Sequence, residues 1–233
     1  MKNILITGAN RGIGLEMTRQ LLTQGERLIA TCRQPMKADA LQALDDQFPE
    51  QVTILPLEVT NTASIQAAYN ASQRIISHLD VLINNAGILD GNETLATFDP
   101  DVMQQTFDVN TIGPMRVVTQ FLPLLRNAEQ AKIINITSQL GSLQAMTRNW
   151  GRYSYNSSKA ALNMLTRMLS NDLKEEGISV ICIHPGWVQT DMGGANASIS
   201  PSESAAGILT IINDLTLAQN GRFYTYTGEE HIW

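Results

Sequence analysis

Short apolar runs alternate with amphipathic segments along most of the chain. The runs are rich in Ile, Leu and Val, which is typical of buried strands, and the segments between them carry apolar residues at helical spacing. The expected strands are residues 2–7, 27–33, 52–59, 80–84, 132–137, 179–184 and 221–226, and the expected helices are residues 15–24, 38–48, 63–79, 100–126, 155–176 and 201–215. Such alternation predicts right-handed crossovers and a parallel sheet of about seven strands with helices on both faces.

A glycine-rich turn joins the first expected strand to the first expected helix. Gly8 can take a tight backbone conformation, Gly12 lets the main chain approach a pyrophosphate, and Gly14 lets helix and strand pack closely. The phosphates then lie at a helix N-terminus, which favours anions. A purely structural turn is the alternative. The flanking strand and helix favour a dinucleotide site, and with it a Rossmann-type, doubly wound, three-layer domain that spans residues 1–233.

Basic residues stand where an NAD-binding protein usually has an acid, about 20 residues beyond the glycines. Between Glu26 and Asp39 the sequence has Arg33 and Lys37, and Arg11 lies inside the glycine turn. A guanidinium binds a phosphate through paired, charge-assisted hydrogen bonds. Arg11 and Arg33 therefore predict NADP(H) as the cofactor, through its 2′-phosphate. The alternative is a pair of solvated surface arginines.

Small and polar residues follow the fourth expected strand, where Asn84, Asn85, Ala86 and Gly87 stand in sequence. Consecutive amides can tie neighbouring strands together, and the small Ala86 and Gly87 leave room for a ribose. A plain loop is the alternative. Further on, Asn110 precedes Gly113-Pro114 inside the expected helix 100–126, and these residues are poor in a helix interior. We expect a local break there.

Tyr155 and Lys159 lie four residues apart in an expected helix, so that their side chains share one face. An ammonium near a phenol favours the phenolate, and we expect the pKa of Tyr155 to fall below its usual value of about 10. A tyrosine tuned in this way can act as an acid or base near neutral pH. Ser138 follows the fifth expected strand, and its hydroxyl is expected to face the same cleft. The Tyr–Lys pair alone also arises by chance.

Two segments without clear periodicity complete the expected cleft. Residues 139–154, which include Met146, Arg148, Asn149 and Trp150, are expected to line a substrate pocket. Residues 191–200 are rich in Gly and Ser, and such a segment beside a cleft is a natural lid.

The composition argues against several classes of partner. The chain has 233 residues, 43% hydrophobic and 16% charged, with a net charge of −6, and it lacks the basic stripe that a nucleic-acid surface needs. No apolar run approaches the roughly 20 residues of a membrane span, and the strand pattern starts too early to leave room for a leader peptide. Cys32 and Cys182 are too few for a zinc site and are expected to be thiols. We expect a cytoplasmic protein without nucleic-acid, membrane or metal partners.

In combination, these motifs resemble the short-chain dehydrogenase/reductase superfamily. The matching positions, in order, are residues 7–14, residues 84–87, Asn110, Ser138, Tyr155 with Lys159, and Pro185-Gly186. Residues 136–142, 185–192 and 223–233 are similar to the C-factor-like and carbonyl-reductase-like branch. The resemblance covers nearly the whole chain and implies an NADP-dependent oxidoreductase, acting on a carbonyl or alcohol as a reductase.

The resemblance also implies residue roles. Tyr155 would donate or accept the proton, Lys159 would bind the nicotinamide ribose and lower the pKa of Tyr155, and Ser138 would hold the substrate oxygen. Asn110 would anchor a water molecule that relays protons. The other residues implied to contact the cofactor are Gly8, Asn10, Arg11, Gly12, Ile13, Gly14, Arg33, Glu58, Val59, Asn84, Ala86, Gly87, Pro185, Gly186, and, at the nicotinamide end, Val188 and Thr190.

The sequence departs from the family pattern at two points. Glu58 stands where the family usually has an Asp against the adenine, so that contact stays open, and the segment from Ser138 to Tyr155 is longer than the commonest spacing. The alternative function is an NADP(H)-binding signalling or sensor protein, because the C-factor-like name is attached to intercellular signalling. The intact Ser138, Tyr155 and Lys159 argue against it.

A homodimer is a further expectation. The expected helix 155–176 is apolar over more of its circumference than packing on one sheet face requires, which indicates a partner helix. In the family this helix and the one over residues 111–126 commonly form a bundle between subunits, although carbonyl reductases can be monomers.

Overall fold

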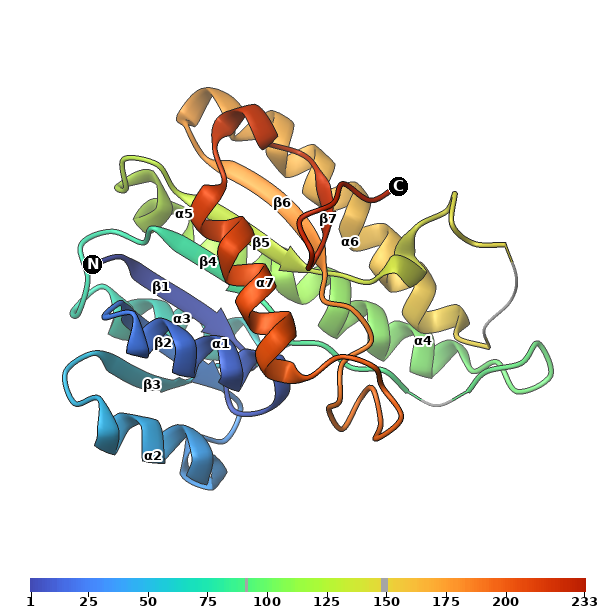
Figure 1. Ribbon diagram of the computed structural model, residues 1–233, viewed down its shortest axis with the longest axis horizontal. Coiled ribbons are helices and arrows are strands. Elements are labelled where there is room, and N and C mark those ends of the chain that lie inside the picture. The colour runs from blue at the N-terminus through green and yellow to red at the C-terminus, as the bar shows by residue number, and fades with distance from the viewer. Residues whose placement is uncertain (91, 148–150) are drawn as a thin grey trace.

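Seven parallel strands form one continuous sheet in the computed structural model, which describes residues 1–90, 92–147 and 151–233 (Figure 1). The strands are β1 (Asn3–Thr7), β2 (Arg27–Cys32), β3 (Val52–Pro56), β4 (Val81–Asn84), β5 (Lys132–Ile136), β6 (Ser179–His184) and β7 (Phe223–Thr225), in the spatial order β3-β2-β1-β4-β5-β6-β7. Every neighbouring pair is parallel. The predicted Rossmann-type, three-layer α/β fold is confirmed.

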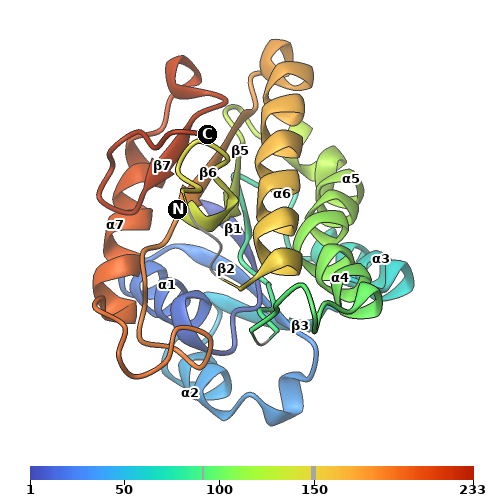
Figure 2. The same ribbon diagram turned by 90° about the vertical axis from the view of Figure 1, so that its right-hand side faces the viewer.

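Helices cover both faces of this sheet, and each face has its own apolar core. On one face lie α1 (Gly12–Thr23), α2 (Asp39–Gln47) and α7 (Pro201–Asp214), and on the other lie α3 (Thr62–Ser72), α4 (Pro100–Phe107), α5 (Gly113–Arg126) and α6 (Tyr153–Asp172) (Figure 2). Within β1, Ile4 and Ile6 face the first core and Leu5 faces the second. Alternate side chains of a strand point to opposite faces, so these strands need apolar residues at every position.

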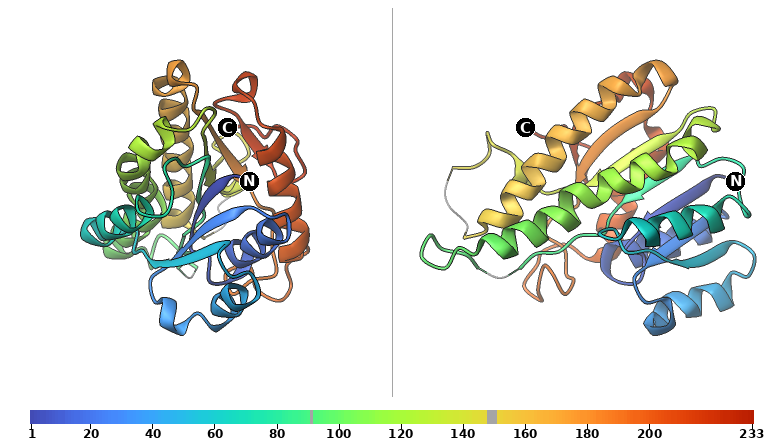
Figure 3. Two further views of the ribbon diagram at one scale, coloured as in Figure 1. Left: turned by 90° about the vertical axis from the view of Figure 1, so that its left-hand side faces the viewer. Right: turned by 180° about the vertical axis from the view of Figure 1, so that it is seen from behind.

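The predicted break in the helix 100–126 is a π-helical turn, Asp108–Ile112, which lies between α4 and α5. An extra residue in one helical turn frees local backbone groups, and such turns are frequent at functional sites. The helical path continues through it, and α5 then runs beside α6 across the second face, as the view from behind shows (Figure 3).

Several element boundaries differ from the prediction. The expected strand 52–59 ends at Pro56, because the next residues leave the sheet: the backbone N–H of Glu58 donates to the Ser64 hydroxyl of α3 at 3.0 Å. The expected helix 63–79 ends at Ser72, and Leu79 instead donates its backbone N–H to Leu124 of α5 at 2.9 Å. β7 covers only Phe223–Thr225.

In the described part of the chain, no helix combines the length and apolar character needed to cross a membrane.

Gly14 allows α1 to approach β1, and a substitution there tests this contact. A Cβ at Gly14 would lie 2.3 Å from the Gly8 carbonyl oxygen and 2.5 Å from Asn85 Nδ2. Alanine would gain up to about 1 kcal/mol of helix propensity, but overpacking typically costs about 1–3 kcal/mol. We expect Gly14→Ala to lower the free energy of unfolding in urea titrations. An unchanged or higher midpoint would contradict this close contact.

Candidate active site

The carboxyl ends of the parallel strands meet at one edge of the sheet, where ligands bind in doubly wound folds. β1 ends at Thr7, β4 at Asn84, β5 at Ile136 and β6 at His184. The glycine turn, Asn85, Ser138 and Pro185 follow these strand ends, and α6 brings Tyr155 and Lys159 to the same edge, so segments far apart in the sequence lie together there (Figure 1).

The glycine turn has the geometry that a dinucleotide cradle requires. Gly8 and Gly12 have φ angles of +67° and +54°, which favour glycine. A Cβ at Gly8 would lie 3.0 Å from the Cα of Ala86, so the turn lies directly against the segment after β4. α1 begins at Gly12, and its N-cap residue Arg11 offers no side-chain cap to the first N–H groups. The helix N-terminus can therefore accept an anion. Asn10 and Ile13 are partly buried in this turn.

The two candidate phosphate-binding arginines lie at the same edge. Arg33 is exposed and follows β2, and Arg11 is exposed in the glycine turn. Arg11 Nη1 forms an ion pair with Asp191 Oδ2 at 2.9 Å. This pairing could not be predicted from the sequence. Beyond β3, Glu58 is partly buried and Val59 is buried, close to the start of α5: a Cβ at Gly113 would lie 3.0 Å from the Val59 side chain.

The consecutive amides after β4 connect strands on both sides, as the sequence suggested. Asn84 Nδ2 donates to Asn135 Oδ1 of β5 at 2.9 Å. Asn85 Nδ2 donates to the carbonyl oxygens of Thr7 and Gly8 at 3.0 and 3.1 Å. These bonds fix Ala86 and Gly87 beside the glycine turn.

Tyr155 and Lys159 project from the first turns of α6 into the protein, with 9% and 5% of their surfaces exposed. Lys159 Nζ lies 5.7 Å from the centre of the Tyr155 ring and donates to the Ile136 carbonyl oxygen at 2.9 Å. Ser138 makes a side-chain hydrogen bond to Tyr155. The predicted acid/base pair and the predicted hydroxyl therefore meet in one place.

The expected low pKa of Tyr155 is wrong for this structure. Burial raises the pKa of the phenol, and this effect outweighs the hydrogen bond from Ser138 and the charge of Arg152, which both lower it. The Lys159 ammonium is itself buried and bonded to a carbonyl oxygen, and burial lowers its pKa to about 8. The sequence showed the spacing of the two residues but not the loss of water around them.

Asn110 lies in the π-helical turn and fixes the segment after β4. Its Oδ1 accepts from the Ile88 N–H at 2.9 Å, and its Nδ2 donates to the Ile88 carbonyl oxygen at 2.9 Å and to Ser158 Oγ at 3.1 Å. A Cβ at Gly87 would lie 3.3 Å from Asn110 Oδ1 and 3.6 Å from Lys159 Nζ. Because Gly87 has no side chain, the space beside the Asn110 and Lys159 side chains stays free of protein atoms from residue 87.

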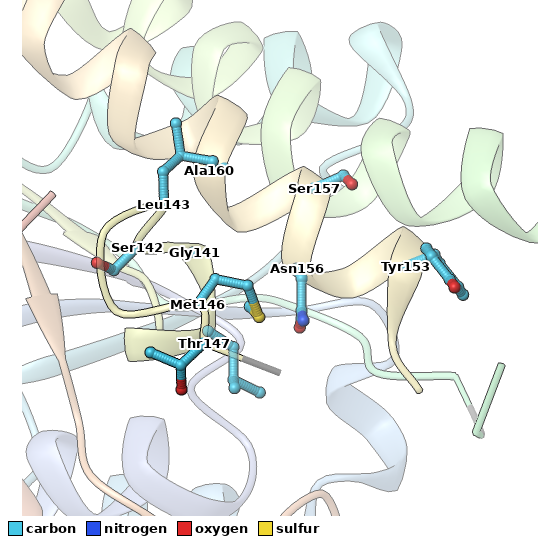
Figure 4. A pocket seen from close by; sticks show the side chains of 10 residues that line it. Gly141, Ser142, Leu143, Met146, Thr147, Tyr153, Asn156, Ser157 and Ala160 are labelled. Carbon is cyan, nitrogen blue, oxygen red and sulfur yellow. The ribbon is translucent and has the colours of Figure 1, made fainter. Parts of the chain in front are cut away.

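The loop after Ser138 is held against α6. Asn163 accepts from Thr137 Oγ1 at 2.7 Å and donates to the Gly141 carbonyl oxygen at 3.1 Å. A cavity of about 620 Å³ lies between this loop and the outer side of α6, and Asn156 and Met146 point into the same space (Figure 4). Its lining, mostly apolar, consists of Leu140, Gly141, Ser142, Leu143, Met146, Thr147, Tyr153, Asn156, Ser157 and Ala160. The predicted pocket residues Arg148, Asn149 and Trp150 lie outside the described residues.

The segment after β6 folds back toward the glycine turn. Gly186, next to Pro185, has a φ angle of +87°. Val188 is buried and pairs with Ile199 through an isolated bridge. A Cβ at Gly12 would lie 3.1 Å from Thr190 Cγ2, so the residue just before the expected lid 191–200 lies against the glycine turn, and Asp191 at the start of that segment pairs with Arg11.

Comparison with known proteins places the chain in a family. The family model for short chain dehydrogenase matches residues 2–199. C-signal of Myxococcus xanthus is 44% identical over 155 residues, which are 66% of this chain and 93% of that protein.

Solved structures give longer matches. The NADPH-bound carbonyl reductase from chicken fatty liver is 40% identical, with a TM-score of 0.94 over 100% of this chain and 99% of that one. Carbonyl reductase Sniffer of D. melanogaster is 35% identical, with a TM-score of 0.96 over 100% of both chains. The chain belongs to the short chain dehydrogenase family.

Proposed function

We propose that this protein is an NADP-dependent carbonyl reductase. The observation that carries the proposal is the convergence of Ser138, Tyr155 and Lys159 at the carboxyl edge of the sheet, beside a glycine turn suited to a dinucleotide. The full-length similarity to NADPH-bound carbonyl reductase of chicken supports both the reaction class and the cofactor.

The residues along this edge fit NADP(H). Gly8, Gly12 and the open N-terminus of α1 would hold the pyrophosphate. Arg11 and Arg33 would bind the 2′-phosphate, and Lys159 would bind the nicotinamide ribose. The remaining contacts would come from Asn10, Ile13, Gly14, Glu58, Val59, Asn84, Ala86, Gly87, Asn110, Tyr155, Pro185, Gly186, Val188 and Thr190. When bound, the nicotinamide supplies the hydride.

The protein itself orients the substrate and supplies the proton. The Ser138 hydroxyl would bond the substrate oxygen and orient it, while the Tyr155 hydroxyl would deliver a proton to that oxygen. Lys159 as an ammonium stabilises negative charge on the phenol. Asn110 would hold a water molecule that returns a proton to the site. The mostly apolar cavity between residues 140–147 and α6 is a separate feature, because its lining does not include Ser138, Tyr155 or Lys159.

A signalling or sensor role is the weaker reading. The similarity to C-signal covers 66% of this chain, whereas the similarity to the chicken reductase covers all of it. A protein that only senses NADP(H) has no need of the buried Ser138–Tyr155 hydrogen bond or of Lys159.

We further propose a cytoplasmic protein with a small-molecule substrate and no nucleic-acid partner. Cys32 and Cys182 are both buried free thiols, which suits a reducing compartment. The net charge of −6 disfavours a polyanionic partner.

We expect Tyr155→Phe to abolish turnover and to leave NADPH binding nearly intact, because only the transferable proton is lost. The measurement is NADPH oxidation with a panel of aldehydes, ketones and quinones, together with a fluorescence titration of NADPH. A variant with a near-normal rate would refute Tyr155 as the acid.

Because burial lowers the pKa of Lys159 to about 8, the free protein loses the ammonium as the pH rises through 8. We expect the NADPH dissociation constant to rise about tenfold between pH 7 and 9.5, the value of a charge-assisted hydrogen bond. Lys159→Arg stays protonated and should show a flat profile. A flat wild-type profile would contradict the role of Lys159.

The arginines should set the cofactor preference. Loss of a charge-assisted bond to the 2′-phosphate corresponds to about a ten- to hundredfold change in affinity. We expect wild type to prefer NADPH, Arg33→Asp to lose most of the preference and Arg11→Ala a smaller part. Asp191→Asn frees Arg11 and should tighten NADPH binding about two- to fivefold. Equal dissociation constants for NADPH and NADH in low salt would show that neither Arg11 nor Arg33 binds the 2′-phosphate.

A homodimer through α5 and α6 is also proposed. Met164 and Met168 on α6 are 63% and 53% exposed, a pattern suited to a partner helix. Light scattering at micromolar concentration should give about 51 kDa, twice the chain mass of 25.6 kDa. Met164→Glu should reduce it to the single-chain mass. A wild type at the single-chain mass would rule out this dimer.

A further inference from the structure

Glu93 is a buried carboxylate without a role in the chemistry proposed above. It lies between β4 and α4, and only 7% of its surface is exposed. Burying a carboxylate is costly unless hydrogen bonds replace the lost water. Both bonds come from one residue: the Ser154 N–H donates to Glu93 Oε2 at 2.8 Å, and Ser154 Oγ donates to Glu93 Oε1 at 2.5 Å. The carboxylate is thus committed to a single point on α6.

That point is the first turn of the helix that carries Tyr155. Ser154 is the second residue of α6 and immediately precedes Tyr155. The first N–H groups of a helix have no intrahelical acceptor, and the N-cap residue Arg152 provides no side-chain cap. Glu93 therefore caps α6 from a separate segment, and its negative charge suits the helix N-terminus.

Two flanking contacts bind the same segment to α6. On one side, Ile88 is bonded through Asn110 to Ser158. On the other, the Phe98 ring meets the Tyr153 ring edge to face, with centroids 6.3 Å apart. Glu93 lies between these contacts in the sequence. Among the described residues of this segment, Glu93 is the one whose side chain bonds to Ser154, the residue next to Tyr155.

We propose that Glu93 is a positioning residue that fixes the first turn of α6 so that the Tyr155 hydroxyl stays within reach of Ser138 and the substrate oxygen. The proposal rests on the acid/base role proposed for Tyr155. A displacement of about 1 Å at a reacting group can lower a rate on the order of 100-fold, whereas the cofactor contacts of the glycine turn lie elsewhere on the sheet edge. Lys159, the proposed cofactor ligand on α6, is held separately by its bond to the Ile136 carbonyl oxygen, so loss of the cap should lower turnover and spare cofactor binding.

The test compares Glu93→Ala and Glu93→Gln with Asn61→Ala. Asn61 is the N-cap residue of α3, where its side chain accepts from the Ser64 N–H at 3.0 Å, and it is not among the residues of the proposed site. We expect Glu93→Ala to lower kcat about tenfold or more, with an NADPH dissociation constant within twofold of wild type. Glu93→Gln keeps an acceptor oxygen and should recover most of kcat. Asn61→Ala should lower the thermal midpoint but not kcat.

The proposal is overturned if kcat of Glu93→Ala stays within twofold of wild type, if its NADPH binding weakens in parallel with kcat, or if Glu93→Gln loses as much as Glu93→Ala. If Glu93→Ala fails to fold, Ser154→Ala takes its place. It removes the hydroxyl bond and keeps the N–H bond, and a kcat equal to wild type in this variant would reject the role.

Tyr155→Phe, measured alongside, separates this inference from the proposed function. If Tyr155→Phe is inactive and Glu93→Ala is fully active, the positioning role of Glu93 is rejected and the acid role of Tyr155 stands. An active Tyr155→Phe removes the acid/base assignment and the positioning role together.

Discussion

The candidate site depends on a polar seam, a set of buried hydrogen bonds that joins α6 to β5 and to the loop after β5. Asn135 Nδ2 donates to Thr166 Oγ1 at 2.9 Å, Thr137 Oγ1 donates to Asn163, and Lys159 Nζ donates to the Ile136 carbonyl oxygen. Apolar contacts alone would let the helix slide or rotate by small amounts. Buried hydrogen bonds have one satisfied arrangement, because a shift would leave donors and acceptors unpaired in a medium without water.

The same seam explains the electrostatic character of the site. It excludes water from Tyr155 and Lys159, so that the phenol holds its proton more tightly and the ammonium less tightly than in solution. Desolvation disfavours the charged form of each group, so the pKa of Tyr155 rises above its usual value while the pKa of Lys159 falls to about 8, and the two values move apart. Transfer of a proton from the Tyr155 phenol to the Lys159 amine therefore costs more free energy here than between the same groups in water, so both groups keep their protons at neutral pH.

Much of the fold and of the site could be predicted from the sequence. Alternating apolar runs indicated the parallel sheet. Gly8, Gly12 and Gly14 indicated the turn, because the backbone conformations and the close packing of that turn require glycine at these positions. Burial and long-range pairing leave no such signal. Arg11 meets Asp191 across 180 positions of sequence, and Glu93 meets Ser154 across 61. For the same reason, helix spacing brought Tyr155 beside Lys159 correctly but gave the wrong direction for the phenol pKa.

All seven strands run in the same direction, so every connection must cross the sheet before the next strand can pair. The residues of the cleft therefore come from β–α units that span most of the chain, with no local hairpin to bring any two of them together early. Such non-local topologies fold slowly, because the entropy of loop closure is lost before the contacts form. The cleft can be completed only in the last stages of folding. Recovery of activity would therefore report completed assembly of the sheet, whereas helical content would return earlier.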